Sequence, residues 1–208
     1  MDKAYWEHYY KEHAVPAAPS LFAEFVSTEY LEPGMRLIEL GCGNGRDSVF
    51  FARKGVSVRA VDQVDEEIAF LNNSYAHEKL EFAIGNFTKL KTDNVFDCVY
   101  SRFTLHSVPV EEELRVLEWA NASLVEGGVF CVEVRSINDP KLQEGDRVSD
   151  CENIVDGHYR RYLDLHAFKE RLLGLGFAVL FSEERTGFAP YGSEDPPVIR
   201  VVAKKVGS

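Results

Sequence analysis

The sequence predicts a three-layer α/β domain around a seven-stranded sheet that is mostly parallel, with an antiparallel last strand. Short apolar runs alternate with helix-like segments between residues 36 and 134, which is typical of parallel strands joined by helices. Closely spaced glycines follow the first run directly. The last two runs have no helix between them, so they contain an antiparallel partner. With 208 residues, of which 45% are hydrophobic, the chain is long enough for one domain spanning residues 1–208.

Each predicted strand is an apolar run bounded by turn residues, and the seven runs cover residues 36–40, 56–61, 80–84, 96–101, 129–134, 177–181 and 198–203. The predicted helices cover residues 21–30, 47–54, 66–78, 111–124 and 165–173. Ser20 has a side chain suited to cap the first helix, because its hydroxyl can accept a bond from a free backbone N–H. Gly55 suits the end of the second helix, where the chain often turns left-handed.

Two segments lie outside this alternation. About residues 1–32 form a helical N-terminal segment whose early aromatic side chains suit either a lid over a ligand or a face packed on the sheet: Tyr5, Trp6, Tyr9 and Tyr10. About residues 136–163 are polar and lack a clear period. They follow the fifth strand, so they lie over the edge of the sheet where α/β proteins bind ligands. We therefore expect a substrate cap there.

The loop after the first strand predicts a nucleoside pocket. Gly41, Gly43 and Gly45 stand at alternate positions, where the backbone can turn left-handed or approach a ligand with no Cβ in the way. The second strand runs into Asp62, whose carboxylate is placed to accept hydrogen bonds from a ribose. Glu39 stands just before the loop. A carboxylate there would repel a pyrophosphate, whereas it suits a ligand with an amino group and a sulfonium.

This paired motif, Glu-x-Gly-x-Gly-x-Gly from Glu39 to Gly45 with Asp62 at the next strand end, resembles the class I S-adenosylmethionine (SAM) dependent methyltransferases. The resemblance extends over nearly the whole chain. It implies a Rossmann-like methyltransferase sheet, SAM as cofactor and S-adenosylhomocysteine (SAH) as product. Further segments, such as 43–47, 100–106, 133–136, 158–161 and 194–196, are similar to a bacterial group of small-molecule methyltransferases, itself distantly similar to tellurite-resistance methyltransferases.

The resemblance also implies which residues bind the cofactor: Glu39, Gly41, Cys42, Gly43, Gly45, Asp62, Gln63, Asn86, Phe87 and Ser101. Asn86 stands where the family often has Asp, and its carbonyl oxygen can still accept a bond from the adenine amine. A plain core aromatic is the alternative for Phe87.

Arg102 and His106 follow the fourth strand and are the predicted catalytic residues. His106 is the candidate general base, because the ordinary pKa of histidine lies near working pH; packing or capping of a helix start is the alternative. The predicted substrate-binding residues are Arg135, His158, Arg160 and Arg161. Because neighbours on a strand point opposite ways, we expect only one of the two consecutive arginines to bind an anionic acceptor.

Composition narrows the remaining possibilities. A net charge of −11 without a basic stripe argues against nucleic acid as a partner. There is no membrane-length apolar run, no signal-peptide pattern, and the cysteines are scattered, so we expect a cytoplasmic protein without a metal. The predicted reaction is methyl transfer to O or N of a small acceptor, either anionic or sugar-like. A thiol or metalloid methyltransferase, a non-catalytic SAM-binding regulator and a nicotinamide enzyme are the alternatives.

Overall fold

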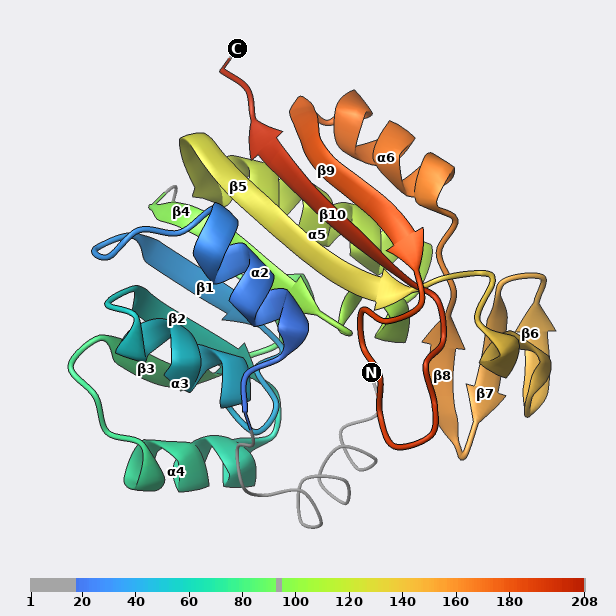
Figure 1. The fold of residues 1–208 in the computed structure, drawn as a ribbon, viewed down its shortest axis with the longest axis horizontal. Helices are drawn as coiled ribbons and strands as arrows, with labels where there is room; N and C mark the ends of the chain where they lie inside the picture. Colours follow the sequence, from blue (N-terminus) through green and yellow to red (C-terminus); the bar gives the residue numbers. More distant parts are fainter. Residues whose placement is uncertain (1–17, 93–94, 208) are drawn as a thin grey trace.

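The computed structural model describes residues 18–92 and 95–207 and has the predicted α/β architecture. Its central sheet has the strand order β3-β2-β1-β4-β5-β10-β9 (Figure 1). The strands are β1 (Arg36–Leu40), β2 (Ser57–Asp62), β3 (Leu80–Ile84), β4 (Phe96–Arg102), β5 (Leu124–Arg135), β9 (Phe177–Arg185) and β10 (Val198–Lys205). The first five pair in parallel, and β10 runs antiparallel to both β5 and β9. The mostly parallel sheet with its antiparallel last strand is confirmed.

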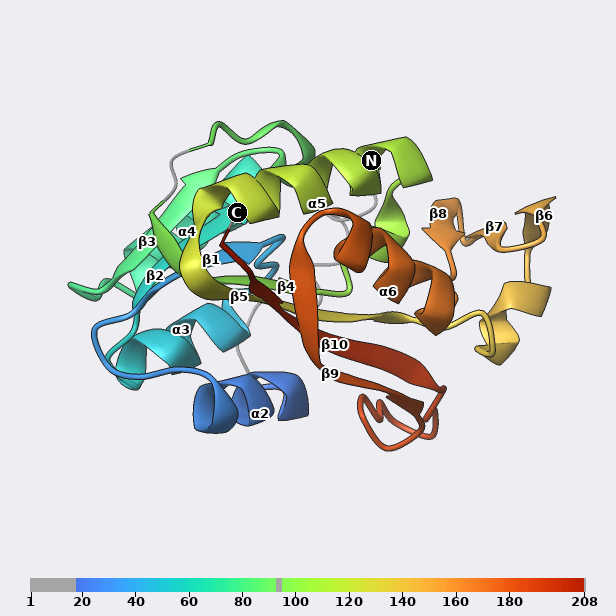
Figure 2. The ribbon, with the colours of Figure 1, turned by 90° about the horizontal axis from the view of Figure 1, so that it is seen from above.

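Helices cover both faces of this sheet. They are α2 (Leu21–Glu29), α3 (Arg46–Arg53), α4 (Asp65–Ser74), α5 (Val110–Ser123) and α6 (Leu165–Gly174). Seen from above, α2 and α3 lie on one side and α5 and α6 on the other (Figure 2). Consecutive residues of β1 point to opposite faces of the sheet, where two separate hydrophobic cores lie. Leu37 packs in the core that contains α2, α3 and α4, while Ile38 packs in the core that contains α5 and α6. The three predicted layers are therefore present.

Local signals set the helix boundaries closely but not everywhere. The hydroxyl of Ser20 accepts a bond of 3.0 Å from the N–H of Ala23 and caps α2 as predicted. The helix predicted over residues 66–78 is shorter, because α4 ends at Ser74. Beyond it, His77 forms a β-bridge with Leu80, and its ring nitrogen accepts a bond from the N–H of Lys79. This turn leads the chain directly into β3.

The segment expected to be irregular contains regular structure. After the 3₁₀ helix η3 (Pro140–Gln143), it forms a second antiparallel sheet of β6 (Asp146–Ser149), β7 (Glu152–Val155) and β8 (His158–Arg161). Each strand has only four residues, too few to give a readable period. This small sheet lies beyond the carboxyl end of β5, the place expected for the cap (Figure 1).

The four aromatic residues of the predicted lid lie outside the described residues. The described part of that segment contains α2, which buries Phe22, Ala23 and Val26 against the sheet. Two more 3₁₀ helices, η1 (Phe87–Lys89) and η2 (Leu105–Ser107), follow β3 and β4. Within residues 18–92 and 95–207, no helix is long and apolar enough to cross a membrane.

Candidate active site

A cavity of about 480 Å³ opens at the carboxyl ends of β1, β2, β4 and β5, between the small sheet and the loop that joins β9 to β10. Its volume lies in the range of small-molecule sites. Most of the predicted site residues line it: Glu39, Gly41, Cys42, Gly43, Asp62, Gln63, Phe87, Arg102, His106, Arg135, His158 and Arg160. The topology thus gathers side chains from distant parts of the chain at one edge of the sheet.

Four predicted residues do not line the cavity. Gly45 adopts a φ of 71° at the start of α3. The side-chain oxygen of Asn86 accepts bonds of 2.9 Å from both the N–H and the hydroxyl of Thr88, so it caps η1. Ser101 is fully buried and shares a bond of 2.5 Å with the hydroxyl of Thr104. The fourth, Arg161, points away from the cavity, as described below.

The glycine loop forms one wall of the cavity. Gly41 has a φ of 68°, and a Cβ there would collide with the methyl group of Thr104. Its N–H donates to the carbonyl of Val61, 2.8 Å away, which folds the loop over the end of β2. The N–H of Gly43, whose φ is 53°, donates to Asp62 Oδ2 over 3.0 Å. Glycine is therefore required at both the turn and the contact.

Two buried carboxylates stand in this wall. Asp62 is held by Gly43 and by the N–H of Val64, which donates to Oδ1 over 3.1 Å, and the residue lines the cavity. Glu39 accepts a bond from the hydroxyl of Ser48. Burial and the negative charge of Asp47 raise the pKa of Glu39 well above its usual range. A cationic ligand would relieve the cost of this buried charge.

Asp47 is a site residue that the sequence analysis did not find, although it stands in the first turn of the helix after the glycine loop. Its oxygens accept bonds from the N–H and hydroxyl of Ser20, at 2.8 and 2.7 Å, and from the hydroxyl of Tyr100 at 2.9 Å. These bonds tie the start of α2 to the cavity wall. Because Asp47 is engaged in this way, Glu39 is the one of these two neighbouring carboxylates that is suited to face a ligand.

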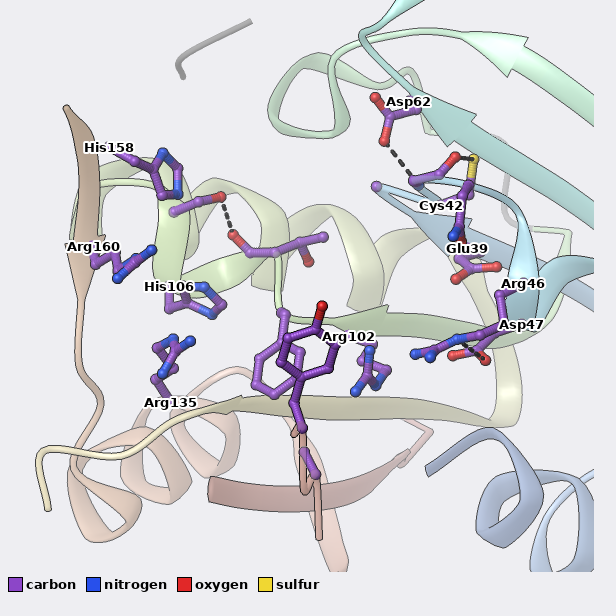
Figure 3. Close-up of a pocket in the computed structure, with 18 of the residues that line it drawn as sticks. Glu39, Cys42, Arg46, Asp47, Asp62, Arg102, His106, Arg135, His158 and Arg160 are labelled. Carbon is purple, nitrogen blue, oxygen red and sulfur yellow. Dashed lines mark hydrogen bonds and ion pairs between the residues drawn. The ribbon is translucent and has the colours of Figure 1, made fainter. Parts of the chain in front are cut away.

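The opposite end of the cavity is basic, with His106, Arg135, His158 and Arg160 gathered there, while Glu39 and Asp62 lie at the other end (Figure 3). His106 lies in η2 and is 4% exposed. Burial and the positive charges around it, foremost that of Arg135, lower its pKa well below the usual range, so the imidazole is neutral. Its Nδ1 atom has no hydrogen-bond partner among the described residues.

Phe103 lies between the two ends and was not predicted as a site residue. It has a φ of 54°, unusual for any residue but glycine, and its N–H donates to the carbonyl of Glu133 over 2.8 Å. Its ring lies 4.5 Å from the Arg102 guanidinium and meets His106 edge-on, with centroids 5.6 Å apart. Strained conformations of this kind concentrate at functional sites.

Arg102 and Arg161 are both held by buried carboxylates. Arg102 Nε donates to Glu133 Oε1 over 2.9 Å. Arg161 pairs with Glu113 and donates to the carbonyls of Val108 and Leu105 over 3.1 and 3.2 Å. Arg161 therefore fastens β8 to the main domain, whereas Arg102 keeps a place on the cavity wall.

The other cavity residues that the sequence analysis did not assign are Asn44, Arg46, Thr104, Ser107, Lys141, Ala189, Pro190, Tyr191, Glu194 and Pro196. Several belong to the β9–β10 loop, where the sequence analysis quoted segment 194–196 in the resemblance but gave it no role. Among the described residues, no three histidine, cysteine or acidic side chains are grouped to hold a metal ion. Glu39 and Asp62 match the cationic and ribose parts of SAM, so the residues present fit that cofactor.

Residues 5–181 match the family described as "Methyltransferase domain". The chain belongs to this methyltransferase family. Phosphoethanolamine N-methyltransferase 1 of Zea mays is 28% identical to this methyltransferase domain over 169 residues, 78% of this chain and 32% of the plant protein. Trans-aconitate 2-methyltransferase of Mycobacterium tuberculosis (strain H37Ra) is 30% identical over 115 residues, 54% of this chain and 42% of that protein. The chain spans less than half the length of each of these relatives.

Solved structures share the fold of the methyltransferase domain. The 1,6-didemethyltoxoflavin-N1-methyltransferase of Burkholderia thailandensis, with bound SAH, has a TM-score of 0.76 at 19% identity, covering 99% of this chain and 87% of that chain. A SAM-dependent methyltransferase of Methanosarcina mazei gives 0.74 at 19% identity and covers 88% and 98%. The resemblance to class I SAM-dependent methyltransferases is confirmed. The narrower one to tellurite-resistance enzymes stays a prediction.

Proposed function

We propose that this domain transfers a methyl group from SAM to an oxygen or nitrogen atom of a small anionic acceptor. The observation that carries the proposal is the opposite character of the two cavity ends, with Glu39 and Asp62 at one and Arg135 and Arg160 at the other (Figure 3). When bound, SAM would supply an electrophilic methyl group on a sulfonium. The residues of the chain have to align the acceptor, exclude water and accept a proton.

The acidic end would hold the cofactor. The Glu39 carboxylate, buried without a cationic hydrogen-bond partner in the described structure, is suited to accept bonds from an ammonium group. Asp62 lines the cavity and is oriented by Gly43 and Val64, so its carboxylate is preorganised to accept bonds from ribose hydroxyls. Gln63 and Phe87 line the cavity beside it, where the adenosine would lie.

His106 would take the proton of the acceptor. Its neutral imidazole can accept, and its Nδ1 atom has no partner among the residues described. An anionic acceptor would oppose the positive field of Arg135 and Arg160. This would raise the pKa of His106 and make it a stronger base once the acceptor has bound.

The acceptor class follows from Arg160, which lines the cavity and has no carboxylate partner in the described part of the chain. A neutral sugar-like acceptor would leave this guanidinium without a counter-charge. The names of two relatives, phosphoethanolamine and trans-aconitate methyltransferases, also contain a phosphate or a carboxylate acceptor. A non-catalytic SAM-binding module fits less well, because the cavity continues past Glu39 to His106 and Arg160.

The proposal is tested first by isothermal titration of SAM and SAH. We expect micromolar binding that is lost in Asp62→Ala and retained in Asp150→Ala, which removes a fully exposed carboxylate outside the cavity. SAH production with SAM is then measured against a panel of small carboxylates, phosphate esters and neutral sugars. Absence of SAH binding, or turnover confined to neutral acceptors, would overturn the proposal.

A further inference from the structure

An ion pair bridges two separate segments at the rim of the basic end. Lys141 lies in η3, and Glu194 lies in the loop between β9 and β10. The Lys141 Nζ atom is 2.6 Å from Glu194 Oε2, and both residues line the cavity. The pair therefore forms part of the wall that an acceptor would meet.

Both backbones that carry this ion pair have hydrogen bonds of their own. The N–H of Lys141 donates to Asp139 Oδ1 over 2.9 Å, and its carbonyl accepts a bond of 2.6 Å from the amide of the buried Asn153. Glu194 exchanges two backbone bonds with Tyr191, of 2.8 and 2.9 Å. Because η3 is held by Asn153 and Glu194 lies in a hydrogen-bonded turn, the ion pair has less chain entropy to overcome.

The charges at this end can be paired one by one. Arg135 donates to Asp139 over 2.5 Å, and Lys141 is neutralised by Glu194. Arg160 has no carboxylate partner among the residues that the structure describes. The bond from Lys141, together with the positive charges of Lys141, Arg135 and Arg160, lowers the pKa of Glu194 and keeps it ionised. One positive charge is thus left for an acceptor.

We propose that Glu194 is a specificity-determining residue: by neutralising Lys141, it makes the acceptor end favour a singly charged anionic group over a doubly charged one. Without Glu194, the ammonium of Lys141 would become a second cation for a doubly charged group. The inference rests on the proposed function, because it assumes that Arg160 and its surroundings bind the acceptor.

The test compares a doubly and a singly charged anion on the SAH-loaded protein. Sulfate and acetate are titrated separately into the wild type, Glu194→Gln and Glu183→Gln. Glu183→Gln is the control, because it changes the net charge by the same amount as Glu194→Gln but removes a carboxylate of β9 that lies outside the cavity. We expect Glu194→Gln to raise the ratio of sulfate to acetate affinity roughly fivefold, a typical effect of one partly exposed charge. Glu183→Gln should leave the ratio unchanged.

Two further variants separate the possible failures. Adding Lys141→Gln to Glu194→Gln should return the ratio to the wild-type value, because Lys141 is the cation that Glu194 neutralises. Arg160→Gln should weaken both anions. If SAH does not bind, or Arg160→Gln changes neither anion, the proposed function fails and this inference with it. If Arg160→Gln weakens both anions but Glu194→Gln leaves the ratio unchanged, only the role of Glu194 is overturned. That role is also overturned if neither anion binds to the wild type or to Glu194→Gln.

Discussion

Arg160 and Arg161 are consecutive residues of β8 that face opposite sides of the strand. Arg160 lines the cavity, whereas Arg161 is 5% exposed and pairs with Glu113 of α5. Arg171 of α6 also contacts Glu113, over 2.8 Å. Arg160 thus stays at the cavity wall, while Arg161 fastens the strand that carries both residues.

The two arginines should respond differently to the same substitution. Arg161→Gln should destabilise the fold by about 3 kcal/mol, because it leaves the buried Glu113 with Arg171 alone. Arg160→Gln should raise the KM of the acceptor and leave stability nearly unchanged. Urea unfolding measures the first effect and initial rates the second. Equal loss of stability in both variants would contradict the assignment.

Replacement of His106 should separate chemistry from cofactor binding. His106→Gln is expected to lower kcat by about 10² to 10⁴, the usual contribution of a general base, while SAH affinity stays the same. Parallel turnover assays and SAH titrations measure the two effects. A loss of SAH affinity as large as the loss of rate would rule out the role as base, and an unchanged rate would favour a thiol or metalloid acceptor that ionises by itself.

The pH profile of the wild type should report the same residue. The lowered pKa of His106 keeps the imidazole neutral at and above neutral pH, so kcat/KM should be flat there and fall only at acid pH. A bound anionic acceptor raises this pKa, so the acid limb of kcat should lie at higher pH than that of kcat/KM. Coincident limbs would show that the acceptor does not offset the positive field of Arg135 and Arg160.

Glu39 should stabilise the cofactor complex at the cost of the free protein. Burial raises its pKa, so the folded chain binds the proton more tightly than the unfolded one, and the stability of the free protein falls as pH rises towards that pKa. Glu39→Gln should therefore raise the free energy of unfolding at pH 7.5 by on the order of 1 kcal/mol. SAH binding should weaken roughly 10- to 100-fold through loss of a charged hydrogen bond.

Urea unfolding at pH 5 and pH 7.5 tests whether Glu39→Gln raises or lowers the free energy of unfolding. The stability difference between Glu39→Gln and wild type should be larger at pH 7.5. A variant that is less stable than wild type at both values would show that the bond from Ser48 outweighs the cost of burying the charge.

A side chain at Gly41 should destabilise the fold, and shortening the residue that it would collide with should restore part of the stability. Gly41→Ala combines a left-handed backbone with a collision at Thr104, and we expect a loss of roughly 2 to 4 kcal/mol. Thr104→Ser removes the methyl group and keeps the hydroxyl that bonds Ser101. The double variant should regain part of the thermal stability. If the double variant melts at the same temperature as Gly41→Ala, the collision with Thr104 is not the cause of the lost stability.

The sequence predicts the central sheet well because its strands are long enough to show a pattern. Strand β1 has the predicted bounds, β2 is shifted by one residue towards the C-terminus, and β4 extends one residue beyond its prediction. The small sheet of β6, β7 and β8 was missed because four-residue strands joined by tight turns leave no period to detect.

In the candidate site too, the residues beside a local sequence motif were predicted, whereas those that depend on distant contacts were not. Glu39 and Asp62 were found because each stands at a recognisable strand end beside a glycine loop. Asp47 was quoted in a motif but given no role, since its bonds to Ser20 and Tyr100 cross long stretches of chain. Phe103 was not predicted, because neither its own residue type nor those of its neighbours indicate a left-handed backbone at this position.

By itself, the sequence determined the order of strands and helices, the glycine loop and the carboxylates beside it, because these depend on backbone conformation and on neighbours a few residues apart. Only the tertiary structure decided that Arg160 and not Arg161 faces the cavity, and that Glu194 meets Lys141. Such choices depend on which charged groups share a buried space or a narrow rim, and long-range packing alone sets those distances.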